Sequence, residues 1–249
     1  MLLAGLPMDP LTIAASSGLR SRMESLSLLA NNLANATTSG YKSDSEFYGL
    51  YTSPDGDSSS EGATLPDIQR QWTDFSQGTL QPTGNPLDVA LSGPGFLTVA
   101  GPGGDLYTRN GSLHVSPAGD LVTSEGFAVR GVGGAAIHIT SGASVEIAPD
   151  GVVRQAGHTL GQLAVVNFKS TNSLIKMGGT CFQNTDPKNP PVAARDVQVE
   201  QGKLESSNVG VPEAAMRLVG VMRQFEMLQK AVSLGVDMDS KSIQEVARV

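Results

Sequence analysis

The chain has 249 residues, of which 39% are hydrophobic and only 5% are aromatic, so it can form a core that is mostly aliphatic. Its formal net charge is −7 and Lys and Arg form no dense cluster, which argues against nucleic acid as a partner. The 29 Gly and 14 Pro exceed ordinary usage but stay below the level of disordered chains. We therefore expect many tight turns in a folded protein.

The first helix is predicted from apolar residues that recur at alternating steps of four and three after Leu19. These residues are Met23, Leu26, Ala30 and Leu33. We expect the helix to begin after Pro10, with Asp9 as its N-cap, and to run to about Ala34. Such a stripe is typical of a helix that packs against another helix.

Three asparagines, Asn31, Asn32 and Asn35, stand at the end of this helix and precede TTSG. Asparagine tolerates the left-handed conformation and caps backbone groups, so one interpretation is a helix end and nothing more. The other is that Asn32 and Asn35, which lie on nearly one face, fix the register where helices meet, because a polar residue at a seam penalises slipped pairings.

Residues 43–85 are predicted to form an extended connector with a flexible acidic loop, PDGDSSSEG, at 54–62. The acidic residues of this loop miss the spacing of a regular calcium-binding loop, so we favour a solvated loop over a calcium site. Trp72 and Phe75 follow as apolar anchors for a strand or a bend.

Short strand-like runs separated by Gly- and Pro-rich turns fill residues 86–203 and predict a compact all-β domain of barrel or sandwich type. The dipeptide Asn110-Gly111 is the strongest hairpin signal in the chain, because it suits a type I′ turn. The single cysteine, Cys181, excludes an internal disulfide and has no neighbours with metal-ligand spacing, so we interpret it as a small apolar residue in a strand.

The second helix is expected to start near Val211, with Pro212 at its first position and Glu213 at the positive end of its dipole. Its apolar stripe again alternates steps of four and three, and comprises Ala214, Leu218, Val221, Phe225, Leu228 and Val232. Gly235 is a candidate break. The predicted fold class is therefore mainly β with terminal α-helices: residues 1–42 and 204–249 pair as a coiled-coil-like α-helical domain around the central β domain.

No motif of a known active site accompanies the three histidines, His114, His138 and His158, and the Gly-Pro-rich runs lack the following helix that a phosphate-binding loop requires. We therefore expect no enzyme activity, no catalytic residues, no cofactor and no metal ion. The beginning of the chain has neither a basic region nor an apolar run long enough for a Sec signal or a membrane span, with either Met1 or Met8 as the start. The protein is expected to stay inside the cell or to leave by a route that reads no such signal.

Three segments resemble the bacterial flagellar rod and hook protein family. LSLLANNLANATTSGYK (26–42) is similar to its N-terminal signature, and the runs at 86–99 and 107–123, which include YTRNG, are similar to the entry into its β domain. LESSNVGVPEAAMRLVGVMRQFEMLQKAV (204–232) resembles its C-terminal helix, with Arg223, Phe225 and Glu226 matching an arginine-aromatic-glutamate element. The resemblance covers nearly the whole chain. RQFEMLQK is closer to the proximal-rod members than to the distal-rod or hook-type members, which remain alternatives.

The resemblance implies a structural subunit of the flagellar basal-body rod that self-assembles through its terminal helices into the axial drive shaft. Its implied partners are copies of itself, other rod proteins and the flagellar export apparatus, with no nucleic acid and no direct membrane insertion. We expect the termini to be loose in the free subunit and to order on assembly. The predicted assembly seam comprises Met23, Leu26, Ala30, Asn32, Leu33, Asn35, Leu218, Val221, Arg223, Phe225 and Leu228. Proteins of other classes, a secreted β-domain enzyme, a carbohydrate-binding module or a cytoplasmic coiled-coil scaffold, are the less favoured hypotheses.

Overall fold

The computed structural model describes residues 10–52, 64–140 and 144–246. Within these ranges the chain is mainly β and carries a long helix toward each end, which confirms the predicted class. The described residues divide into two units. Unit 1 draws on Met1–Ala34, Asp44–Thr73 and Gly210–Val249, and unit 2 on Asn35–Ser43 and Asp74–Val209, so the chain passes between the units four times.

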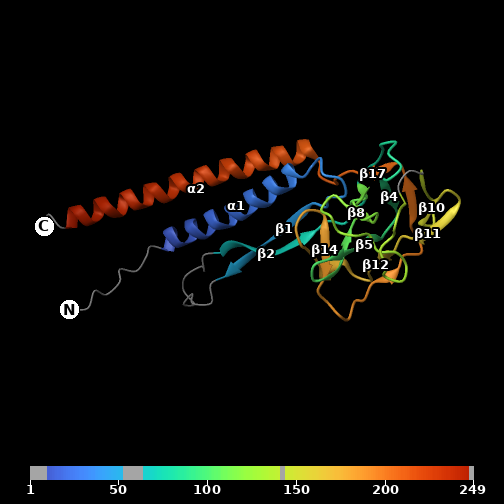
Figure 1. Ribbon diagram of the computed structural model, residues 1–249. Helices are drawn as coiled ribbons and strands as arrows, with labels where there is room; N and C mark the ends of the chain where they lie inside the picture. The colour runs from blue at the N-terminus through green and yellow to red at the C-terminus, as the bar shows by residue number, and fades with distance from the viewer. Residues whose placement is uncertain (1–9, 53–63, 141–143, 247–249) are drawn as a thin grey trace. The chain divides into compact units, whose positions relative to one another are not determined.

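Two helices run side by side in unit 1 (Figure 1), and both begin where the sequence predicts. Helix α1 spans Pro10–Ala34 and starts with a proline, whose missing N–H needs no partner at that position. Its expected N-cap, Asp9, lies outside the described residues. Helix α2 spans Val211–Val246 and carries Glu213 in its first turn. The predicted break at Gly235 is wrong, because one glycine lowers helix propensity by only about 1 kcal/mol.

An antiparallel hairpin completes unit 1. Strand β1 (Asp44–Thr52) pairs with β2 (Thr64–Thr73), from Asp44 opposite Thr73 to Thr52 opposite Thr64, with a register shift between Phe47 and Tyr48. Helix α1 contacts both α2 and this hairpin. The hairpin falls in the stretch that we expected to be a connector, whereas the whole of the predicted acidic loop at 54–62 lies outside the described residues.

A six-stranded antiparallel sheet is the largest element of unit 2. Its strands are, in spatial order, β13 (Leu174–Lys176), β14 (Cys181–Asn184), β6 (Gly104–Thr108), β5 (Phe96–Gly101), β12 (Val165–Asn167) and β15 (Val192–Ala193). The central pair is set in register by Leu97 opposite Thr108. A short 3-10 helix, η1 (Thr171–Ser173), precedes β13.

Smaller antiparallel sheets surround it, and several join segments that are distant in the sequence. The three-stranded sheet has the order β11 (His158–Gln162), β10 (Val152–Gln155), β9 (Val145–Ile147). The two-stranded pairs are β16 (Gln198–Gln201) with β4 (Val89–Ser92), β17 (Lys203–Glu205) with β3 (Leu80–Pro82), and β7 (Leu113–Val115) with β8 (Leu121–Thr123). The end of unit 2 therefore returns to pair with its beginning.

Two hydrophobic clusters fill unit 2. The larger is aliphatic, as the composition predicts, and includes Val99, Leu121 and Val153 with almost no exposed surface. The smaller is mostly aromatic and comprises Phe96, Tyr107, Phe168, Leu174 and Phe182. Phe75 meets the rings of Phe96 and Phe182 edge-on at centroid distances of 5.5 and 5.0 Å, a favourable arrangement.

The prediction of a hairpin turn at Asn110-Gly111 is wrong. Strands β6 and β7, which flank it, do not pair with each other. Instead, the Gly111 carbonyl accepts a hydrogen bond from the Val89 amide at 3.0 Å, and a β-carbon on Gly111 would overlap the Val89 carbonyl oxygen. Glycine stands here because two backbone segments approach closely, a role that a dipeptide rule does not distinguish from a turn.

Candidate functional site

Helix α1 has two different faces. Its buried stripe consists of Gly18, Ser21, Ser25, Leu28, Leu29 and Asn32. The apolar stripe that the sequence singled out lies about 130° away around the helix, at 3.6 residues per turn. In that stripe Met23 is 58% exposed, Ala30 is exposed, and Leu26 and Leu33 are half-buried. The stripe covered within the subunit is thus mostly small and polar, with Leu28 and Leu29 as its large apolar members, and the predicted apolar stripe is more accessible.

Helix α2 also has two faces. The predicted stripe is its less exposed side: Ala214 is buried, and Leu218, Val221, Phe225 and Leu228 are half-buried. Leu228 lies toward α1, because a β-carbon on Gly18 would be 3.5 Å from its Cδ1. A second apolar stripe lies about 140° from the first. It comprises Met216, Met227, Leu234 and Met238, which are 70%, 62%, 62% and 69% exposed.

The polar residues of the predicted seam, Asn32, Asn35 and Arg223, lie in three different places. The Asn32 side chain is 5% exposed, and its Nδ2 donates to the Asp44 carbonyl at 2.7 Å while its Oδ1 accepts from the Asp44 amide at 3.0 Å. Asn32 thus joins α1 to the hairpin. Asn35 follows the helix, where its carbonyl accepts from the Thr38 amide at 3.1 Å and its Oδ1 accepts from the Thr38 hydroxyl at 3.3 Å, so it lies in the turn that ends α1. Arg223 is exposed on α2.

A buried ion cluster in unit 2 was not foreseen from the sequence. We define it as Lys42, Arg109 and Glu205, whose side chains are 0%, 4% and 0% exposed. Lys42 Nζ lies 2.5 Å from Glu205 Oε1, and Arg109 Nη1 lies 3.1 Å from Glu205 Oε2. Each cation comes from a different motif of the resemblance, and the anion from a third, at a separation of 163 residues from Lys42. No local pattern could reveal this meeting.

Further hydrogen bonds hold the ion cluster, while the buried Arg109 Nε has no hydrogen-bond partner among the described residues. Lys42 Nζ donates to the Ser76 carbonyl at 2.6 Å, Arg109 Nη2 donates to the Gly93 carbonyl at 2.7 Å, and Glu205 Oε1 accepts from the Gly78 amide at 2.9 Å. Burial lowers the pKa of the Lys42 ammonium, while its hydrogen bond and attraction to Glu205 oppose that shift. The cluster is therefore ionic but strongly desolvated.

The chain segments that enter and leave unit 2 are bonded together beside this cluster. The Gly40 amide donates to the Glu205 carbonyl at 2.7 Å, and the Ser43 amide donates to Asn208 Oδ1 at 2.7 Å. Asn208 Nδ2 in turn donates to the Asp74 carbonyl at 2.8 Å. Gly40 has a φ of +69°, and a β-carbon there would overlap the backbone of Arg109 and Asn110. Gly40 is thus required for a close approach of two backbone segments, and Lys42, two residues later, belongs to the ion cluster.

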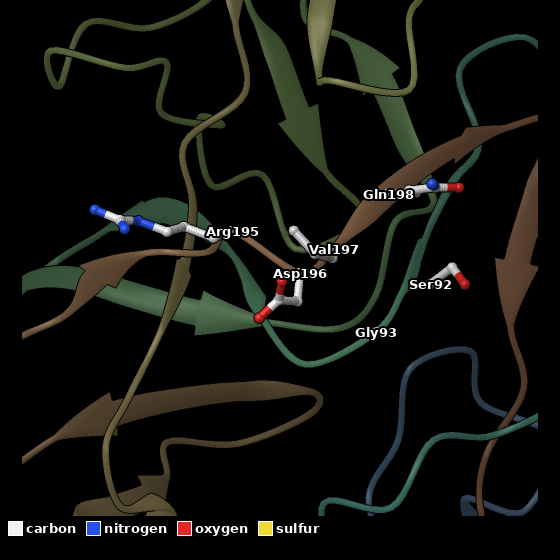
Figure 2. A pocket seen from close by; sticks show the side chains of 6 residues that line it. All are labelled: Ser92, Gly93, Arg195, Asp196, Val197 and Gln198. Atoms are coloured by element: carbon white, nitrogen blue, oxygen red, sulfur yellow. The ribbon is translucent and has the colours of Figure 1, made fainter.

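Unit 2 also has an open surface hollow (Figure 2), lined by Ser92, Gly93 and residues 195–198. The side chains of Arg195 and Asp196 point in different directions, so the hollow does not converge on a reacting centre (Figure 2). Across the described ranges, no group of three His, Cys, Asp or Glu side chains is placed to hold a metal ion. Nor is either helix, in its described part, long and apolar enough to cross a membrane.

Comparison with known proteins assigns the family. Residues 90–155 match the flagellar hook protein FlgE/F/G D1 domain, and residues 200–245 match the flagellar basal body rod FlgEFG protein C-terminal domain. The chain is 32% identical to the flagellar basal-body rod protein FlgF of Escherichia coli, over 91% of this chain and 94% of the relative. It is 30% identical to FlgF of Caulobacter vibrioides, over 90% and 92%, and 30% identical to FlgG of Buchnera aphidicola from Acyrthosiphon pisum, over 94% and 98%. The chain therefore belongs to the flagellar basal-body rod protein family and is a structural subunit of the basal-body rod.

Proposed function

We propose that the chain builds the proximal part of the rod by packing the exposed apolar stripes of its two helices against helices of neighbouring subunits. We name as the outer stripes Met23, Leu26, Ala30 and Leu33 of α1 and Met216, Met227, Leu234 and Met238 of α2. The single observation that carries the proposal is the α2 outer stripe, in which four large apolar side chains are each at least 62% exposed.

Large exposed apolar stripes are unfavourable unless something covers them. Each Met or Leu that becomes buried contributes about 1.5–3 kcal/mol, so four on α2 are enough to drive association. Methionine also adapts its shape to different partners, which suits a helix that must meet both copies of itself and other rod proteins. A head-to-tail contact that does not close generates a helical assembly, as an axial shaft requires.

The inner faces have a different role in this proposal. Helix α2 pairs with α1 in a coiled-coil-like manner through Leu218, Val221, Phe225 and Leu228. The helices of 1–42 and 204–249 then form the axial core, and the β domain of 86–203 lies outside it and contacts neighbouring subunits. Because Gly18, Ser21 and Ser25 add little apolar area to the covered face of α1, whose large apolar side chains in the described part are Leu28 and Leu29, the isolated pair is weak. The termini therefore order on assembly, and their looseness suits export of an unfolded or partly folded chain.

The proposed route is the flagellar export apparatus, without a Sec signal, to a rod that spans the periplasm. The proximal position rests on the resemblance of RQFEMLQK to proximal-rod members, while similar identity to FlgF and FlgG relatives keeps the distal position as the alternative. Cross-linking from a cysteine placed at an exposed α2 position such as Gln229 identifies the neighbours and separates the two positions.

The test of the proposal is Met227→Asp in the outer stripe, matched by Gln229→Asp two residues away on the same helix. We expect Met227→Asp to leave the free subunit's circular dichroism spectrum unchanged and to abolish rod assembly and swimming, because a charge would enter the buried interface. Gln229→Asp should assemble and swim normally. Normal assembly of the Met227→Asp protein would refute a role for the outer stripe.

A further inference from the structure

The buried ion cluster holds two cations and one anion in direct contact, and Asp74 adds a weaker attraction for Lys42. Lys42 and Arg109 are two cations, and Glu205 is the single anion that contacts both. Burial lowers the pKa of both the Lys42 ammonium and the Arg109 guanidinium, and the charge of Arg109 lowers the pKa of Lys42 further, whereas Glu205 opposes both shifts. Without Glu205, closing this part of unit 2 would bury two like charges, which is strongly unfavourable.

All the contacts of Glu205 are distant in sequence. Its carboxylate is separated from Lys42 by 163 residues, from Gly78 by 127 and from Arg109 by 96. Closing such long loops carries a large entropic cost that local pairings do not, so contacts of this kind form late. The hairpins β5–β6 and β7–β8, in contrast, join segments that follow each other directly.

Breaking the cluster would release several segments at once. Glu205 holds Lys42, Arg109 and the Gly78 amide through its carboxylate, and the Gly40 amide through its carbonyl. Residues 40–42 and 78 lie close in sequence to two points where the chain passes between the units: it leaves unit 2 after residue 43 and returns to it at residue 74. A pull along the chain from unit 1 therefore reaches these bonds soon after it enters unit 2.

We propose that the Lys42–Glu205–Arg109 cluster is a kinetic lock, which closes after the rate-limiting step in the folding of unit 2 and then sets the rate at which unit 2 unfolds. Interactions absent from the folding transition state slow unfolding and leave the folding rate nearly unchanged. A subunit that folds after export and then bears torque needs this combination. That consequence rests on the proposed export and assembly, whereas the kinetic behaviour of the purified chain does not.

The experiment measures folding and unfolding rates of the full chain by pulsed hydrogen exchange, read by mass spectrometry in peptides of β5 and β6. We expect Glu205→Gln to raise the unfolding rate about 100-fold or more and to change the folding rate by less than about threefold. The matched control is Glu200→Gln, since Glu200 forms a similar pair with Lys203, 2.5 Å apart, but at 29% and 42% side-chain exposure. It should change both rates by less than about threefold.

Lys42→Met is the second variant, for use if Glu205→Gln does not fold. It leaves one cation paired with one anion, and we expect the unfolding rate to rise about tenfold at an unchanged folding rate. The proposal stands if slower folding accounts for less than a third of the loss of stability. It is overturned if folding accounts for a third or more, or if both variants unfold as slowly as the parent chain. If the variants fold and unfold at the parent's rates, the lock is refuted, whatever their assembly shows. If the lock is confirmed but the parent chain does not assemble, the proposed function is refuted and the lock is not.

Discussion

Replacing Asn32 by alanine should loosen the attachment of the hairpin β1–β2 to α1 at Asp44 without melting unit 2. The substitution removes two hydrogen bonds, of 2.7 and 3.0 Å, which pair the Asn32 amide with the backbone N–H and C=O of Asp44. Each such bond contributes about 0.5–1.5 kcal/mol, and leaving the backbone groups of Asp44 without these partners adds to the loss. Because Asp44 is half-buried and water can reach it in part, we expect a total of about 2 kcal/mol.

The assay is native-state hydrogen exchange of the Asp44 amide, with global stability from urea unfolding measured in parallel. A local loss of about 2 kcal/mol corresponds to roughly 30-fold faster exchange. Asn31→Ala is the matched control, because Asn31 is the adjacent residue and is exposed. It should change stability by less than about 0.5 kcal/mol.

The reasoning would be refuted if the Asp44 amide kept its protection in the Asn32→Ala protein. The asparagine would then act where helices of different subunits meet, as the second interpretation of the sequence had it, and the variant would assemble poorly while its hairpin stayed intact.

Three further outcomes follow from the structure. Gly111→Ala should destabilise unit 2 by about 2–4 kcal/mol in urea unfolding, because a β-carbon would force Val89 out of the core. Gly103→Ala, with open space around it, should be neutral. A loss of stability below about 1 kcal/mol for Gly111→Ala would contradict the close approach. Burial raises the pKa of the Cys181 thiol to about 11 from 9.0, so the protonated thiol stabilises the fold fully below pH 9. About 2–3 kcal/mol of the free energy of unfolding is lost as the pH rises from 9 to 11. Cys181→Ala should flatten this decline, and an equal slope of stability against pH in both proteins would count against the shift. Phe225→Asp should abolish motility by breaking the helix pair, and unchanged swimming would argue against the paired-helix assembly. Limited proteolysis of the free subunit should cleave the termini first, and termini that resist protease would argue against it as well.

Neither the hollow of Figure 2 nor the buried Cys181 supports a catalytic hypothesis by itself. The sequence offered no active-site motif, and the family is one of structural proteins. The structural features that suit a rod subunit are the exposed helix stripes and the contacts that anchor distant segments.

Local patterns determined where the helices begin and which family the chain belongs to. Helix α1 starts at Pro10 and ends at Ala34, and α2 starts at Val211, as predicted, because caps and apolar periodicity act over a few residues.

Only the tertiary structure decided which of those stripes is covered and which polar residues meet. The covered stripe of α1 combines small and polar residues with Leu28 and Leu29, since burial depends on what packs against a helix and not on its own periodicity. Gly111 serves a close approach to Val89, and Glu205 joins Lys42 and Arg109 across most of the chain. These contacts depend on which distant segments the fold brings together, and a one-dimensional pattern carries no information about that.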